Sequence, residues 1–247
     1  MRETRIIMGM PITVEIVDAL DPDLFCQVFT YFDSVDARFS TYRENSEICA
    51  FNRGEIAEQN FSADMRAVFA LAHATHADSQ GFFNMMTMDG TCDPSGIVKG
   101  WAIRNAAEIL AREGVENYFI DAGGDIQSSG KNEDGEFWRV GIRSPFHLSE
   151  VIKIVEPRGQ GIATSGSYVR GEHIYNPHLP QQKLKDVVSL TVIGPDVLEA
   201  DRFATAAFAM GADGVYFIES LEGFEAYQVN ARGIATQTTS FGGYVIS

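Results

Sequence analysis

The chain has 247 residues, of which 45% are hydrophobic and 21% charged, so it is long enough for a substantial core and has the composition of a globular protein. Its formal net charge of −15 argues against nucleic acid or an anionic membrane as the main partner, because both need a basic surface. The three cysteines contain no C-x-x-C pair, which argues against a zinc site and a disulfide framework. The sequence shows neither a membrane-length apolar run nor a signal-peptide pattern, and we therefore expect a cytoplasmic protein without membrane insertion.

The first part of the chain is predicted to contain a hairpin and three helices. Alternating apolar residues predict the hairpin over 5–17, and an apolar stripe with helical spacing predicts a helix over 21–38. A short helix is expected after Ser46. Ser62 is predicted to cap a longer helix that runs to Asp78.

The remaining chain mixes helices and strands. A glycine-bearing turn leads into a helix that Gly114 ends, and a buried helix is predicted over 197–210. The stretches 118–130 and 137–145 are predicted to be strands that pair with each other, and 81–88 is predicted to be a short strand or a buried turn. Further strands are expected at 151–157, 161–163, 187–194, 224–230 and near the C-terminus. This mixed order favours one α+β domain spanning residues 1–247, with a mixed, largely antiparallel sheet and helices packed against it.

Asp201 and Thr205 form the first candidate site. They lie four residues apart on the buried helix and therefore face the same way. A buried carboxylate is costly unless it is paired or binds a cation, and carboxylate plus hydroxyl oxygen suits Mg²⁺. The structural alternative is that Asp201 pairs with an arginine and that Thr205 bonds to its own helix.

Two glycine-bearing turns are further candidates. The segment 93–100 can offer backbone N–H groups and the Lys99 ammonium to an anion, although an ordinary helix start with a solvated lysine has the same pattern. The segment 121–125, DAGGD, lets the backbone approach a ligand closely, although a tight turn or a bulge explains it equally well. Neither segment has the spacing of a Walker A loop or of a dinucleotide fingerprint.

The stretch 161–177, GIATSGSYVRGEHIYNP, carries the densest set of hydrogen-bonding groups. It is predicted to begin as a strand and to turn at Thr164, Ser165 and Gly166. Among the five histidines, His173 alone lies among other convergent polar residues, which makes it a plausible proton acceptor, although a lone histidine is more often structural.

Five segments together resemble the ApbE-like flavin transferases, in the order that is typical of that family. The segments are FSTYRENSEICAFN (39–52), DPSGIVKGWA (93–102), DAGGDI (121–126), the stretch 161–177 and ADRFATAAFAMG (200–211). The resemblance implies an FAD:protein FMN transferase that uses Mg²⁺, takes FAD as substrate, transfers FMN to a threonine or serine hydroxyl of a partner flavoprotein, and releases AMP.

The resemblance also implies roles for particular residues. His173 and Asp201 are implied to be catalytic, and Mg²⁺ to be bound by Asp201, Thr205 and the carbonyl of Ala163. The residues implied to bind FAD are Ser40, Tyr42, Glu47, Asp93, Lys99, Gly123, Gly124, Asp125, Thr164 and Ser165.

Three features depart from the family pattern. Asn84 and Asn176 stand where the family has carboxylates, and the R-T-G-x-P segment of the family is shortened to His178-Leu179-Pro180. Amides keep hydrogen bonding but lose charge and basicity. These departures leave open two alternatives, a Mg²⁺-dependent FAD pyrophosphatase and an FAD-binding protein without turnover.

Overall fold

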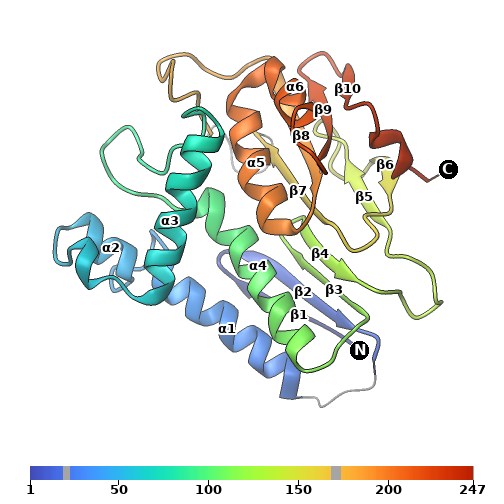
Figure 1. Cartoon of the computed structure of the whole chain (residues 1–247), viewed down its shortest axis with the longest axis horizontal. Helices are drawn as coiled ribbons and strands as arrows, with labels where there is room; N and C mark the ends of the chain where they lie inside the picture. The colour runs from blue at the N-terminus through green and yellow to red at the C-terminus, as the bar shows by residue number, and fades with distance from the viewer. Residues whose placement is uncertain (19–22, 168–173, 247) are drawn as a thin grey trace.

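An antiparallel sheet forms the centre of the molecule in the computed structural model, which describes residues 1–18, 23–167 and 174–246. Eight strands of the described residues make this sheet, and every neighbouring pair is antiparallel. In spatial order the strands are β1 (Arg2–Ile7), β2 (Met10–Ile16), β3 (Tyr118–Ala122), β4 (Asp125–Ser129), β7 (Gly161–Gly166), β8 (Val187–Gly194), β9 (Glu225–Asn230) and β10 (Ala235–Gln237) (Figure 1).

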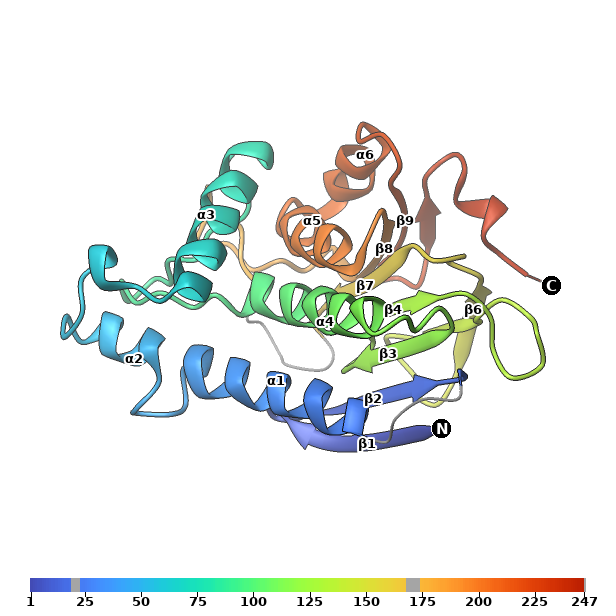
Figure 2. The same ribbon diagram turned by 60° about the horizontal axis from the view of Figure 1, so that its bottom comes forward.

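The helices gather on one face of this sheet. Figures 1 and 2 show α4 and α5 lying over the same face, with α1 beside α4. The helices are α1 (Asp23–Phe39), α2 (Glu47–Asn52), α3 (Ala63–Asp78), α4 (Ser95–Arg112), α5 (Val197–Ala209) and α6 (Gly214–Glu219). Short 3₁₀ turns occupy Glu58–Asn60, Gly211–Asp213 and Phe241–Gly243. No helix in the described part of the chain is long and apolar enough to cross a membrane.

A second, two-stranded sheet, β5 (Val140–Arg143) and β6 (Val151–Val155), covers the opposite face. Successive residues of a strand point to opposite faces, and β7 shows the result. Ala163 joins a buried cluster with residues of α5, whereas its neighbour Ile162 joins a cluster with Val140 and Ile142 of the small sheet. The main sheet is therefore buried on both faces in this region.

Most of the sequence predictions agree with this architecture. The α+β class with a largely antiparallel sheet is confirmed, as are the N-terminal hairpin and the buried helix before Gly211. Ser46 and Ser62 cap α2 and α3, each accepting a hydrogen bond from the backbone N–H three residues later. The single-domain organisation stays a prediction.

One prediction of strand pairing is wrong. The stretches 118–130 and 137–145 do not pair as strands, because Gly123 and Gly124, with φ of 63° and 98°, fold the first stretch back on itself as the β3–β4 hairpin. β5 pairs with β6 instead, and only an isolated bridge joins Lys131 to Phe137.

The turn predicted at 164–166 is also absent. β8 is long enough to pair with every residue of β7, and β7 therefore continues to Gly166 opposite Ser189. The segment 81–88 is a turn with buried Phe83 and Met85, the second of the two structures expected for it.

Candidate functional site

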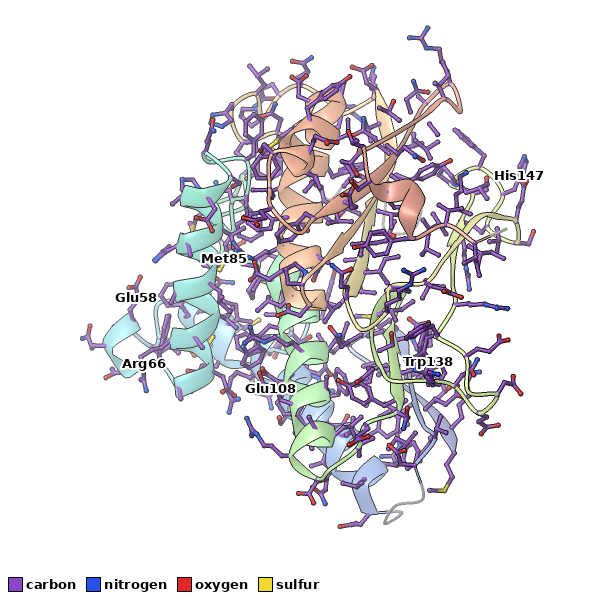
Figure 3. All side chains as sticks on the ribbon, turned by 45° about the vertical axis from the view of Figure 1, so that its right-hand side comes forward. Glu58, Arg66, Met85, Glu108, Trp138 and His147 are labelled. Carbon is purple, nitrogen blue, oxygen red and sulfur yellow. The ribbon has the colours of Figure 1, made fainter. Side chains whose placement is uncertain are left out.

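A cavity of about 980 Å³ is lined by residues of the central strands and of α4 and α5. Its volume is that of a pocket for a large cofactor or nucleotide. One part of its wall comes from β3, β4, β5 and β7 and includes Phe119 and Trp138, whose rings lie 5.3 Å apart. The other part comes from the segment 82–87 and from α4 and α5. In Figure 3, Trp138 lies beside the strands and Met85 lies between α3 and α5.

Two glycines of α4 allow α5 to approach closely at the cavity wall. A Cβ added to Gly100 would lie 2.7 Å from the Cβ of Asp201 and 2.9 Å from the carbonyl oxygen of Val197. A Cβ added to Gly96 would lie 3.2 Å from Cγ2 of Thr205. The glycines of the segment 93–100 therefore bring the two candidate ligands of α5 against α4.

Asp201 is a buried carboxylate, with only 4% of its surface exposed. Its Oδ2 accepts a hydrogen bond of 2.8 Å from the backbone N–H of Gly100, and its Oδ1 lies 3.9 Å from Nζ of Lys99. Burial raises the pKa of Asp201 to about 7, although the Lys99 ammonium opposes this shift. The arginine pairing considered for Asp201 does not occur among the described residues.

Asp125, at the start of β4, is the second buried carboxylate, with 1% exposed. Its Oδ2 lies 2.5 Å from Nζ of Lys99, and its Oδ1 accepts a hydrogen bond of 3.0 Å from the backbone N–H of Thr164. The Thr164 hydroxyl in turn bonds to that of Thr191 at 2.9 Å. Lys99 is thus a partly buried ion-pair partner rather than a solvated lysine.

The glycine pair forms the tight turn that precedes Asp125. Gly123 and Gly124 are exposed and line the cavity, and Asp121 Oδ1 accepts a hydrogen bond of 2.8 Å from the Gly124 N–H. Burial raises the pKa of Asp121 above its usual value, and that same hydrogen bond opposes the shift. The turn therefore presents backbone without side chains at the cavity surface and precedes the buried Asp125.

A model of the ApbE family matches residues 8–91 and 88–228 of this sequence. The chain belongs to the ApbE family. The FAD:protein FMN transferase of Escherichia coli K12 is 30% identical over 185 residues, which are 70% of this chain and 53% of that protein. The FAD:protein FMN transferase of Vibrio cholerae serotype O1 is 38% identical over 130 residues, 49% of this chain and 39% of that protein. The chain therefore spans about half the length of the curated relatives it matches.

Solved ApbE structures have the same fold. The flavin transferase ApbE from Vibrio cholerae superposes with a TM-score of 0.86 at 23% identity and covers 99% of this chain and 98% of its own. The ApbE protein from Thermotoga maritima gives a TM-score of 0.85 at 19% identity, over 100% of this chain and 99% of its own.

Most of the residues implied by the ApbE resemblance meet at the cavity. Those that line it are Asp93, Lys99, Gly123, Gly124, Thr164, Ser165, Asp201 and Thr205. Asp125 is not part of the lining, but it forms an ion pair with Lys99, which is. Asp93 also accepts a hydrogen bond of 3.0 Å from the backbone N–H of Ser95, so it has a structural task at the start of α4 as well.

The donors gathered at α5 are chemically suited to a small divalent cation. The described residues contain no cluster of three or more His, Cys, Asp or Glu side chains that could hold a metal. The available set is instead the Asp201 carboxylate, the half-buried Thr205 hydroxyl and nearby backbone oxygen. Oxygen donors of this kind fit Mg²⁺, and equally Mn²⁺, when phosphate and water complete the shell. Ala163 is fully buried with its methyl group in the core and does not line the cavity, so the metal contact expected of its carbonyl stays a prediction.

The residues predicted from the segment 39–52 lie away from the cavity lining. Tyr42 is 97% exposed, and Ser40 packs beside Cys49, whose Sγ contacts its carbonyl oxygen. Glu47 pairs with Arg38 at 3.2 Å and accepts a hydrogen bond of 2.7 Å from the backbone N–H of Ser62. In this structure Glu47 therefore joins α1 and α2 to the start of α3.

His173 lies outside the described residues, and its role stays a prediction. The chain directly after it borders the cavity through Ile174, Tyr175 and Pro177. The Tyr175 hydroxyl donates a hydrogen bond of 2.7 Å to the carbonyl of Met86 and so fixes this chain to the opposite wall.

The sequence did not identify the aromatic wall. Trp138 is buried, and its indole N–H donates to the carbonyl of Ser129 at 2.8 Å, which holds the ring over the strands. The sequence placed Trp138 in a predicted strand, and a strand pattern does not show that a cavity lies beside it. The one sequence feature that could have indicated an aromatic wall was a tryptophan next to the turn-rich segment 131–136.

Proposed function

We propose that this protein is an FAD:protein FMN transferase that takes FAD as substrate, uses Mg²⁺ and modifies a threonine or serine of a partner flavoprotein. Membership of the ApbE family and the names of its relatives support this function. The observation that carries it is the buried Asp201 beside Lys99 and Asp125, at the wall of a cavity large enough for a dinucleotide. A pyrophosphate is the part of FAD that needs a cation there.

Different residues would bind the metal, the diphosphate and the rest of the nucleotide. Asp201 and Thr205 would hold Mg²⁺ with the Ala163 carbonyl, and Lys99 would contact the diphosphate. The turn at Gly123 and Gly124 would approach the nucleotide with its backbone. When bound, Mg²⁺ supplies Lewis-acid polarisation of the phosphoryl oxygens.

The transfer step exchanges one phosphorus–oxygen bond for another. The acceptor hydroxyl oxygen attacks the phosphorus of the FMN half, the bond from that phosphorus to the bridging oxygen breaks, and AMP leaves with this oxygen. The hydroxyl proton needs an acceptor, for which His173 is the predicted group; such a base typically contributes about 10²–10⁴-fold to the rate. Positioning and charge neutralisation supply the larger part of catalysis in this class of reaction.

Hydrolysis of FAD is the second candidate function. Asn84 lies in the cavity lining at a position where the family pattern has a carboxylate, and its Oδ1 accepts a hydrogen bond from the backbone N–H of Met86. An amide has neither the charge nor the basicity of a carboxylate. This change in the lining is the reason for considering hydrolysis, in which water replaces the acceptor hydroxyl. FAD binding without turnover is the third candidate.

The test is to incubate the protein with FAD, Mg²⁺ and several candidate acceptor flavoproteins, and to measure intact mass and free AMP. We expect an FMN increment on the acceptor, with AMP in equal amount, and loss of both when Mg²⁺ is chelated. AMP and FMN without an acceptor would instead establish a pyrophosphatase, and FAD binding without AMP would establish a binding protein. The cytoplasmic location is likewise a prediction, to be checked by cell fractionation.

A further inference from the structure

Lys99 serves two buried carboxylates at once. Its Nζ lies 2.5 Å from Oδ2 of Asp125 and 3.9 Å from Oδ1 of Asp201, and 15% of its side chain is exposed. Both carboxylates are almost fully buried, so solvent screens them little. Each one also accepts a backbone hydrogen bond, from Thr164 and Gly100 respectively, which fixes its position.

The position of this ammonium conflicts with a metal on Asp201. A cation bound to Asp201 Oδ1 would lie about 2.1 Å from that oxygen, and the ammonium lies 3.9 Å from the same atom. Two positive charges beside the same oxygen repel each other strongly at the effective dielectric constant of partly buried sites. The lysine has a flexible four-carbon stem, so its ammonium can move, whereas each carboxylate is buried and held by a backbone hydrogen bond.

We propose that Lys99 is the counter-ion of the metal site in the absence of nucleotide. Its ammonium neutralises Asp125 and Asp201 and competes with Mg²⁺ for them. The anionic phosphates of a bound nucleotide then attract the ammonium away from the carboxylates. This role rests on the proposed function, because that function supplies the metal and the nucleotide. Lys99 lines the cavity, and its ammonium therefore has a path from the carboxylates to a bound phosphate. The protein alone then binds Mg²⁺ weakly, and the nucleotide prepares the metal site.

The test is calorimetric titration of the protein with MgCl₂ alone, without nucleotide. The variants are Lys99→Met and Lys99→Gln, which remove the charge, and Lys99→Arg, which keeps it. Gln retains an N–H donor for Asp125, so it addresses the same question if the Met variant fails to fold. Lys185→Met removes one exposed positive charge and is the matched control for net charge.

We expect Lys99→Met and Lys99→Gln to lower the Kd for Mg²⁺ by about tenfold or more, and Lys99→Arg and Lys185→Met to stay within about threefold of the unmodified protein. The rise in melting temperature on adding Mg²⁺ should be larger in the two charge-removing variants. An unchanged or higher Kd in both would overturn the proposal, as would no Mg²⁺ binding in any of the proteins. If this order of affinities holds and no FMN transfer occurs, the counter-ion role stands and the proposed function fails.

Discussion

The region of α4 and α5 and the region of α1–α3 each contain a motif carboxylate, but the surroundings of the two carboxylates differ. Both contain a carboxylate within a segment that resembles the ApbE pattern. Asp201 is buried at a cavity wall beside Lys99, and burial raises its pKa to about 7. Glu47 is paired with Arg38, caps a backbone amide and does not line the cavity. The comparison shows that a motif residue gains a chemical role from its burial and its access to a cavity, not from its type.

Asp201→Asn is the sharpest way to break this comparison. The amide keeps a similar shape but removes the charge that would bind Mg²⁺, so we expect FMN transfer to fall by about 10³-fold, or roughly 4 kcal/mol of transition-state stabilisation. Transfer rate and Mg²⁺ affinity should be measured together. A variant that retains Mg²⁺ binding and transfer within about tenfold would remove Asp201 from the site.

The same variant also tests how much the buried charge of Asp201 lowers the free energy of unfolding. Because the pKa of Asp201 is raised, the folded protein keeps a proton that the unfolded chain releases near pH 4, and its stability should fall as pH rises from about 4 to 7. Without Mg²⁺, the free energy of unfolding of Asp201→Asn minus that of the unmodified protein should therefore grow over this interval by a few kcal/mol. Denaturant unfolding at several pH values measures this difference. A difference that does not change with pH would contradict the shift.

Glu47→Gln should have the smallest effect on chemistry. We expect the melting temperature to fall by a few °C, because the ion pair with Arg38 is lost and the hydrogen bond from Ser62 is weakened, a cost of about 1–2 kcal/mol for these partly exposed groups. The KM for FAD should stay within about twofold. A tenfold rise in KM with an unchanged melting temperature would instead support the FAD contact implied by the family resemblance.

Local patterns were sufficient to predict much of the fold. Ser46 and Ser62 marked helix starts because their side chains accept local backbone hydrogen bonds, and the apolar stripe of 21–38 marked the buried face of α1. Which strands pair with each other was harder to predict. The small sheet of β5 and β6 depends on residues brought together from both sides of a loop, and no local signal distinguishes that pairing from one with β4.

The candidate site was predictable in part. The i, i+4 spacing of Asp201 and Thr205 placed both on one helix face, which the structure confirms. The ion pair of Lys99 with Asp125 joins α4 to β4 across the sheet face, and only the tertiary fold creates it. The cavity position of Trp138 was invisible for the same reason.

Gly100 makes the position of a carboxylate depend on the spacing between two helices. Its amide holds Asp201, and its missing side chain provides the room in which that residue sits. A larger residue at position 100 would displace the Asp201 carboxylate, although residue 201 itself would be unchanged. Mutations at position 100 should therefore show epistasis with mutations at position 201.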